Sequence, residues 1–152
     1  IIECICTGIS TGLGEPFFDS VEALIAHMIF AVPATKGIEF GSGFASARMK
    51  GSEHNDAIID ATGTTKTNHA AGINGGITNG NDIVFRVAVK PTSSIGIPQQ
   101  TFNFKHNTIE ELLIEGRHDA CIALRIPVII EAATAVALAD LYLLSQQRSR
   151  VF

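Results

Sequence analysis

Residues 116–144 constrain the fold more than any other part of the chain. A triplet of charge-capable side chains, Arg117 to Asp119, is followed by the longest apolar run in the sequence. Pro127 suits the first turn of a helix, because the N–H group it lacks would have no partner there. From Val128 to Leu144 nearly every helical face is apolar, which predicts a helix buried on all sides at the centre of the protein.

An apolar run of this length can also cross a membrane. A membrane-spanning helix needs about 20 uninterrupted apolar residues. Glu131 and Asp140 interrupt the run well before that length is reached. We therefore interpret it as the core helix of a soluble protein that does not contact a membrane. The polar tail after Ser145 is expected to fray.

The composition predicts one domain with unsatisfied apolar surface. A chain of 152 residues is long enough for a single domain with a real core. Only 17% of the residues are charged and 46% are hydrophobic, so some apolar surface should face another subunit or a further part of the same protein. The net charge of -4 indicates no general affinity for nucleic acid. Residues 1–6 alternate like the interior of a strand and lack an initiator Met, which favours a piece of a longer protein.

The cysteines predict a reducing compartment. Cys4, Cys6 and Cys121 are odd in number and lack CxxC spacing, so reduced thiols in a cytoplasmic protein are expected. The Cys4-x-Cys6 pair would be able to bind a metal from one strand face. No Cys or His partner follows it nearby, so we favour core packing and predict no metal site.

The expected helices and strands are mixed without regular βαβ alternation, which indicates an α+β fold. The sequence predicts strands near residues 1–9, 37–41, 82–89 and 101–104, and helices starting at Asp19-x-x-Glu22, at 108–115 and at 128–144. The first helix should end before Pro33. Asn107 or Thr108 would cap the second. Alternation in 82–89 predicts a strand with at least one wholly buried face.

Three polar segments are candidate sites, each with a structural alternative. The glycine-rich stretch 68–80 allows backbone to approach a ligand or form two tight turns, but it matches neither a Walker A loop nor GxGxxG. Lys90 to Ser94 offers a point charge, three hydroxyls and a proline-fixed backbone that suit a phosphate, or it is a solvated strand end. His54 and Asp56 are catalytic, or they satisfy the backbone of their own loop.

Several of these motifs resemble the C-terminal half of the chorismate synthases. The motifs are Arg117-His118-Asp119-x-Cys121, then Ile126-x-Val128-Ile129-x-Glu131-Ala132-Ala133, with GIEFGSGF at 37–44, RMKGSEHND at 48–56 and the glycine-rich stretch. Ala120 stands where that family usually has proline, and Ala71 replaces a usual glycine. The resemblance extends to about Leu144 and covers only the C-terminal half of such an enzyme.

The resemblance implies a fold, a reaction and partners. The fold would be a β-α-β sandwich with the long apolar helix packed between sheets, assembled as a homotetramer. The reaction would be the anti-1,4-elimination of phosphate from 5-enolpyruvylshikimate 3-phosphate, giving chorismate in the shikimate pathway for aromatic amino acids. This lyase reaction requires reduced FMN without net redox change.

The resemblance also implies site residues. FMN would be contacted by Pro33, Ala34, Gly75, Lys90, Pro91, Thr92, Ser93, Ser94 and Arg117. Asp119 would assist proton transfer beside the flavin ring, with Arg117 holding the flavin and keeping Asp119 ionised. His118 would be structural. The family's general-acid histidines and several substrate-binding arginines lie in its N-terminal half, so that half of the same enzyme is an expected partner.

Two other functions remain open from the sequence. The segment would be a non-catalytic assembly half that is inactive on its own, which its apolar content suits. Alternatively it would belong to a generic flavin-binding oxidoreductase that consumes NAD(P)H. The second alternative is disfavoured because the chain has no dinucleotide-binding fingerprint.

Overall fold

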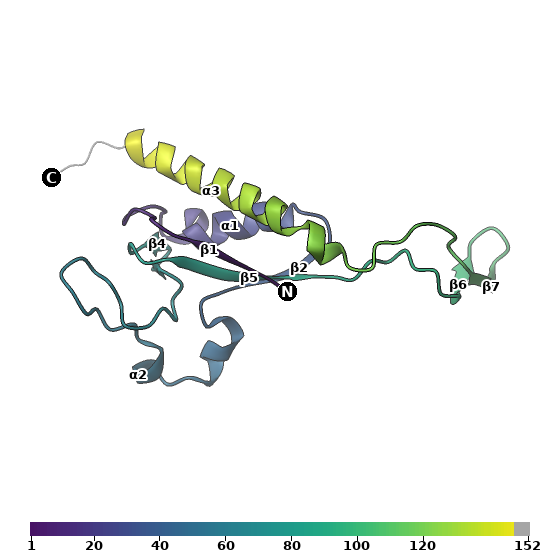
Figure 1. Cartoon of the computed structure of the whole chain (residues 1–152), viewed down its shortest axis with the longest axis horizontal. Coiled ribbons are helices and arrows are strands. Elements are labelled where there is room, and N and C mark those ends of the chain that lie inside the picture. Colours follow the sequence, from purple (N-terminus) through teal and green to yellow (C-terminus); the bar gives the residue numbers. More distant parts are fainter. Residues whose placement is uncertain (148–152) are drawn as a thin grey trace.

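The computed structural model describes residues 1–147, and its body is a three-stranded antiparallel sheet with two helices on one face (Figure 1). The strands lie in the order β1-β5-β2: β1 is Ile2–Cys6, β5 is Ile83–Val89 and β2 is Thr35–Phe40. The helices are α1, Val21–Phe30, and α3, Pro127–Gln147. Helices and strands are mixed as expected, so the α+β class is confirmed.

The core forms between β5 and the two helices. Every second residue of β5 points inward, and Ile83, Phe85 and Val87 are fully buried. Phe85 pairs with Cys4 of β1 and Phe40 of β2, and the two phenyl rings lie 5.5 Å apart. The predicted strand with one wholly buried face is confirmed, because side chains alternate between the two faces of a pleated strand.

The first helix begins one residue later than predicted and ends as expected. Ser20 is the N-cap, and its hydroxyl oxygen accepts a hydrogen bond of 3.1 Å from the backbone N–H of Ala23. The cap expected at Asp19 is therefore wrong, because a short 3-10 turn, Phe17–Asp19, precedes the helix. The helix ends at Phe30, before Pro33, where an X-Pro step disfavours helical backbone.

The long apolar helix α3 is buried along one stripe only. Its buried residues recur at intervals of three or four and join the core beside α1 and β1: Ile130, Thr134, Ala137 and Leu141. Leu138 is partly buried against the core, and six other large apolar side chains are exposed: Val128, Ile129, Val136, Tyr142, Leu143 and Leu144. The expectation of burial on all sides is wrong for this chain, because within residues 1–147 α3 has packing partners on one side only.

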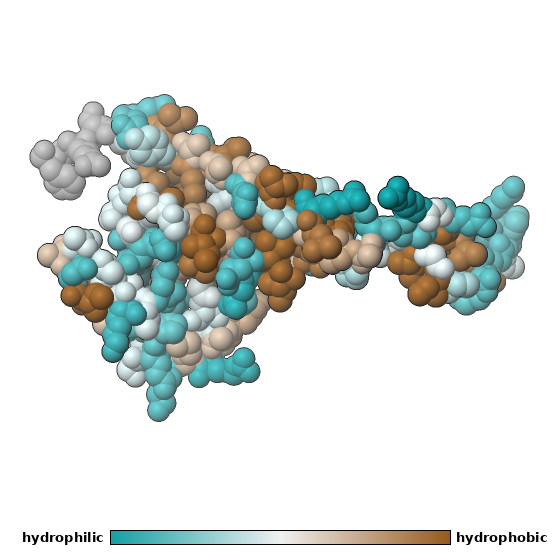
Figure 2. Space-filling view, in the orientation of Figure 1, coloured by the Kyte–Doolittle hydropathy of each residue, from teal (hydrophilic) through white to brown (hydrophobic). Residues whose placement is uncertain are grey.

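By its length and composition alone, α3 is long and apolar enough to cross a membrane. Helix α3 is 21 residues long, its most apolar 18-residue window has a mean hydropathy of 1.8, and 22% of that window is buried. Figure 2 shows apolar residues along α3 and on the projecting hairpin. The buried stripe packs into the core as a core helix does. The end of α3 at Gln147 leaves the rest of the expected frayed tail outside the described residues.

A long arm made of an outgoing and a returning segment projects from the body (Figure 1). It ends in a hairpin of β6, Gln99–Asn103, and β7, Thr108–Leu112. The helix expected from Thr108 is wrong. Ile109 pairs with Phe102 across the hairpin, and such pairs of β-branched and aromatic side chains stabilise strands. Asn107 has a positive φ of 58° in the turn, so it does not cap a helix.

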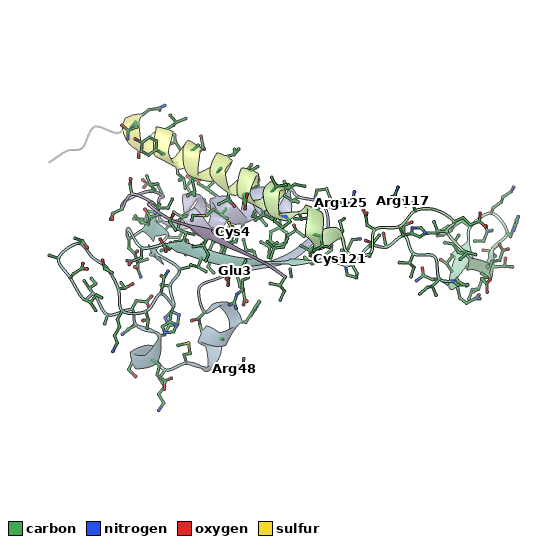
Figure 3. All side chains as sticks on the ribbon, in the orientation of Figure 1. Glu3, Cys4, Arg48, Arg117, Cys121 and Arg125 are labelled. Carbon is green, nitrogen blue, oxygen red and sulfur yellow. The ribbon has the colours of Figure 1, made fainter. Side chains whose placement is uncertain are left out.

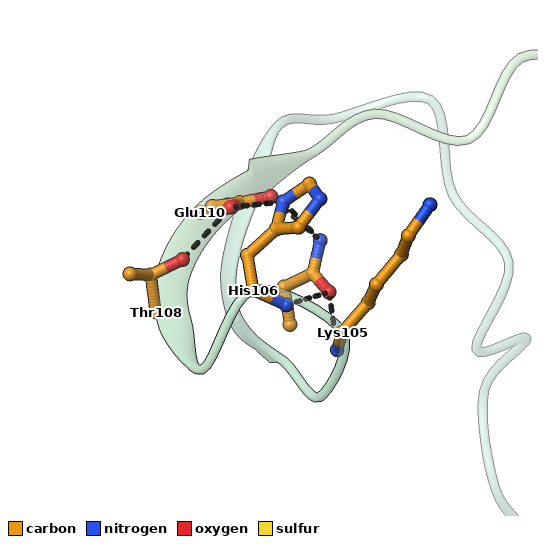
Figure 4. A network of polar contacts seen from close by, with 5 residues as sticks. Lys105, His106, Thr108 and Glu110 are labelled. Carbon is orange, nitrogen blue, oxygen red and sulfur yellow. Dashed lines mark hydrogen bonds and ion pairs between the residues drawn. The ribbon is translucent and has the colours of Figure 1, made fainter.

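The tip of the arm is fixed by hydrogen bonds to one carboxylate (Figure 4). Glu110 accepts hydrogen bonds from the Thr108 hydroxyl at 2.8 Å and the Asn103 amide at 2.7 Å. His106 Nδ1 lies 3.0 Å from the same carboxylate. These contacts, with that of Thr108 the largest, lower the pKa of Glu110. The tip is therefore ordered by polar contacts, although its strands expose apolar side chains.

The glycine-rich stretch forms a tight hairpin, as predicted for its structural alternative. Strands β3, Ile73–Asn74, and β4, Ile77–Thr78, are joined by Gly75 and Gly76, whose φ angles are 59° and 85°. A Cβ on Gly76 would lie 2.6 Å from the Ser20 Cβ. The hairpin docks on the start of α1, where the Gly76 carbonyl accepts the Val21 N–H at 3.0 Å.

The two N-terminal cysteines pack against the core, so the core-packing interpretation is confirmed. Cys4 and Cys6 share the inner face of β1. Burial, followed by the neighbouring Cys4, raises the pKa of the Cys6 thiol to about 12. Burial likewise raises the pKa of Cys4. Cys121 is exposed near the base of the arm. In residues 1–147, no group of three His, Cys, Asp or Glu side chains is placed to hold a metal ion.

Thiol labelling should separate these cysteines. We expect Cys121 to react quickly with a thiol reagent at about pH 8 and Cys4 and Cys6 to react much more slowly, because only the thiolate is a nucleophile. A pKa of about 12 instead of 9.0 leaves Cys6 with roughly a thousandfold less thiolate. The measurement is the time course of label incorporation by mass spectrometry. A rapid phase that survives Cys121→Ser would contradict this arrangement.

Candidate anion-binding site at the base of the arm

Three loops converge where the arm leaves the body, and the pairing of β2 with β5 brings two of them together. Thr35 opposes Val89 in the sheet, so the residue before β2 lies beside the residue after β5. The backbone N–H of Lys90 donates to the Ala34 carbonyl at 2.9 Å. Ala34 holds a left-handed φ of 73° in the turn that follows Pro33. The first two predicted contact segments, Pro33-Ala34 and Lys90–Ser94, are therefore neighbours.

The third loop joins them through Thr92. Its hydroxyl donates to the backbone carbonyl of Asp119 at 3.3 Å. This contact places the Arg117–Asp119 triplet against the Lys90–Ser94 segment. The structure thus brings together all the sequence-predicted site residues except Gly75.

Gly75 lies at the opposite end of α1. It is in the β3–β4 turn, next to Gly76, which contacts the first residue of that helix. Ala34 follows the last turn of the same helix. Ten helical residues span about 15 Å, so Gly75 does not line the cluster within this chain.

The carboxylate of Asp119 pairs with Arg125 and not, as expected, with Arg117. Arg125 Nη2 lies 2.7 Å from Asp119 Oδ1. Arg117 and Arg125 both lie at the junction of body and arm in Figure 3. Exposed fractions of 74% for Arg125 and 40% for Asp119 mean that the pair adds at most about 1 kcal/mol to stability.

His118 supports the base of the arm. Its Nε2–H donates to the Ile114 carbonyl at 2.9 Å, since a carbonyl oxygen only accepts. The ring also lies 3.6 Å from where a Cβ on Gly96 would be. His118 therefore links the outgoing and returning segments of the arm, which agrees with the structural role expected for it.

The converging loops leave several cationic and hydroxyl groups available to a ligand. Four side chains make no hydrogen bond or ion pair with any described residue: Lys90, Ser93, Ser94 and Arg117. Ammonium, guanidinium and hydroxyl donors suit an anionic oxygen-rich group such as a phosphate monoester. Pro91, exposed between Lys90 and Thr92, fixes the backbone that carries them. The residues present therefore fit the phosphate of FMN or of a phosphorylated substrate.

His54 and Asp56, the other polar pair singled out by sequence, anchor their own loop. Asp56 accepts three hydrogen bonds, from His69 N–H, Ala70 N–H and the Thr67 hydroxyl. Burial alone would raise the pKa of Asp56, but these hydrogen bonds outweigh it and the pKa lies below its ordinary value. His54 Nε2 lies 3.1 Å from the Ser46 hydroxyl. The backbone-satisfying alternative therefore describes Asp56, whereas His54 contacts a side-chain hydroxyl.

The loop that this pair anchors also contains the remaining short elements. They are a 3-10 helix, Gly43–Arg48, and the one-turn helix α2, Gly51–His54. An isolated bridge between Ile58 and Thr65 closes the polar loop after them.

Arg125 is the site residue that sequence reasoning missed. It ends a short 3-10 helix, Ile122–Arg125, six positions after its partner Asp119. No helical or strand spacing links the two positions. The only signal in the sequence is that Arg125 is the last charged residue before the apolar run begins.

The fold and the loop cluster define an α+β protein with a candidate anion-binding site. Comparison with known proteins identifies the family. A family model described as chorismate synthase matches residues 1–143. The chain belongs to the chorismate synthase family, a family of lyases.

The relatives support this assignment across the whole chain. A chorismate synthase from Chitinophaga pinensis is 64% identical over 152 residues, which are all of this chain and 46% of the relative. A chorismate synthase from Opitutus terrae is 52% identical over 92% of this chain and 39% of its own length. The chain therefore spans less than half the length of these relatives.

A solved structure confirms the fold. The crystal structure of a chorismate synthase matches with a TM-score of 0.73 and 30% identity, over 94% of this chain and 37% of the solved chain. The expected α+β fold of the chorismate synthase type is confirmed by this likeness.

Proposed function

We propose that this chain supplies the C-terminal share of the active site of a chorismate synthase. The enzyme would eliminate phosphate from 5-enolpyruvylshikimate 3-phosphate to give chorismate, with reduced FMN as cofactor. The observation that carries this proposal is the convergence of Lys90–Ser94, Ala34, Arg117 and Asp119 at the base of the arm in a member of this family.

The charges of the cluster suit such an elimination. Departure of phosphate develops negative charge that positioned cations and hydroxyl donors stabilise. Lys90 and Arg117 offer the cations, and Ser93 and Ser94 offer the hydroxyls. When bound, reduced FMN supplies electron density to the substrate as the bond to phosphate weakens. The cations of this chain hold and orient the anionic groups of cofactor or substrate.

Asp119 is the proposed proton-transfer group. A proton that moves during the reaction needs a carboxylate held within hydrogen-bonding reach. Oδ1 of Asp119 is held by Arg125, and Oδ2 makes no hydrogen bond with any residue from 1 to 147. The carboxylate is therefore both fixed and available. A carboxylate before a helix can also serve as its cap, but α3 starts eight residues after Asp119 and the intervening 3-10 helix is preceded by Cys121.

The exposed apolar side chains of α3 and the arm also support a proposal about assembly with other subunits. Helix α3 and the arm expose many large apolar side chains, more than an isolated domain usually presents. These surfaces support association with the N-terminal half of the same enzyme and with further subunits in the expected homotetramer. The reduced cysteines support the expected cytoplasmic location.

Lys90 tests the cofactor part of the proposal. Lys90→Ala in the full-length enzyme is expected to weaken FMN binding by about 1.5–3 kcal/mol, the range for a hydrogen bond to a charged group. The melting temperature without flavin should hardly change, because the exposed side chain makes no contact that stabilises the fold and its backbone bond to Ala34 is kept. Fluorescence titration with FMN measures the affinity.

Lys66→Ala is the matched control. Lys66 is also an exposed lysine, but it lies in the 60–67 loop away from the cluster. Its substitution should leave the FMN affinity unchanged. Equal affinities for wild type and Lys90→Ala would show that Lys90 is only a solvated strand end.

A further inference from the structure

We propose that Arg125 is a positioning residue for the reaction and acts through the carboxylate of Asp119. The inference depends on the proposed function of Asp119 in proton transfer. It starts from the ion pair of 2.7 Å between Arg125 Nη2 and Asp119 Oδ1.

The backbone beside Arg125 is anchored, so its side chain can fix the orientation of that carboxylate. Arg125 is followed by Ile126, which is 3% exposed in the core. The Ile126 carbonyl accepts the N–H groups of Ile129 and Ile130, at 2.9 Å and 3.0 Å, in the first turn of α3. The backbone beside Arg125 is therefore tied to the first turn of α3, whose buried stripe packs into the core.

Asp119 has no such support of its own. It lies in an irregular segment, and its described contacts are the backbone bond from Thr92 and the ion pair with Arg125. The torsion that orients a carboxylate has a broad energy well, so an unpaired Asp119 would rotate widely. Arg125 holds Oδ1 and thereby aims the unpaired Oδ2.

Because the ion pair of Arg125 and Asp119 is exposed, it can position the carboxylate without contributing much to the stability of the fold. Both side chains are substantially exposed, and exposed ion pairs contribute little to folding. Arg117, two positions before Asp119, makes no ion pair within the described chain and stays available for an anion. The two arginines therefore have different tasks: Arg117 is left for the ligand, and Arg125 orients the carboxylate.

Loss of this orientation should lower the rate and leave binding intact. Misplacement of a reacting group by about 1 Å can cost roughly a hundredfold in rate. We expect Arg125→Gln to lower kcat by about 10- to 100-fold, with the KM for the phosphorylated substrate and the Kd for FMN within about twofold of wild type. Arg125→Lys keeps the charge and should recover part of the lost rate.

The test is a double-mutant cycle in the full-length enzyme. Arg125→Gln, Arg125→Lys, Asp119→Asn and the combination of Arg125→Gln with Asp119→Asn are compared by kcat, KM, FMN affinity and melting temperature. Arg48→Gln is the control, because Arg48 is an exposed arginine far from this junction in Figure 3. If Arg125 acts through Asp119, its substitution has no further effect in the Asp119→Asn background.

Three results would overturn the inference. The first is a wild-type kcat for Arg125→Gln. The second is that Arg125→Gln lowers kcat by the same factor in the wild-type and Asp119→Asn backgrounds. The third is a loss of rate that accompanies a lost FMN affinity or a lowered melting temperature. In the first case an impaired Asp119→Asn variant would leave the proposed function standing. A fully active Asp119→Asn variant would overturn both.

Discussion

Asp119→Asn is expected to lower chorismate synthase turnover of the full-length enzyme by about 10²–10⁴-fold, the usual contribution of a positioned acid–base group. Asparagine keeps the shape of the side chain, and its carbonyl oxygen can still accept from Arg125. It cannot accept a proton. Folding and FMN binding should therefore survive, while proton transfer fails.

The measurements are steady-state turnover with reduced FMN, FMN titration and thermal unfolding. Asp140→Asn is the matched control, since Asp140 is an exposed aspartate near the other end of α3. A variant at position 119 within about threefold of wild type would lie far below the acid–base range and would make this carboxylate structural.

The isolated 152-residue chain is expected to show no detectable turnover. The resemblance implies that the family's general-acid histidines lie in its N-terminal half, which this chain does not match. The base of the arm, with Lys90, Arg117 and Asp119, is exposed in this chain. Electrostatic catalysis is strong where water is excluded, so an open half-site should be ineffective even with FMN added.

Complementation with the missing half is the decisive part of that experiment. Co-expression with the N-terminal half of the Chitinophaga pinensis relative should cover the exposed face of α3 and restore chorismate formation. The mass of the isolated chain is verified before the assay. Robust turnover by that chain alone would show that it needs no other half, and the general-acid assignment would be wrong.

Local patterns predicted the elements whose side chains repeat with a clear period. Alternation in Ile83–Val89 predicted the central strand, and the X-Pro step at Pro33 predicted the end of α1. The helix predicted at 108–115 is wrong, because so short a segment can satisfy either pattern. Pairing with β6, which no local pattern encodes, decides its conformation.

The site was only partly predictable. The resemblance selected Lys90–Ser94 and Asp119, and the structure brings them together through Thr92. The resemblance implied that Arg117 keeps Asp119 ionised, yet Arg125 forms the ion pair. Neighbouring side chains on an irregular segment need not face each other. Arg125, six positions away at the end of the 3-10 helix, reaches the carboxylate instead.

By itself, the sequence determined the family, the α+β class, the long apolar helix and the chemistry of the candidate donors. These properties depend on side-chain type and short-range period, which can be read from a single chain. Only the tertiary structure decided which face of α3 is buried, that residues 108–112 form a strand, and that Arg125 holds Asp119. Those outcomes depend on contacts between distant segments, and the free energy of such contacts exceeds the weak local preferences that sequence patterns express.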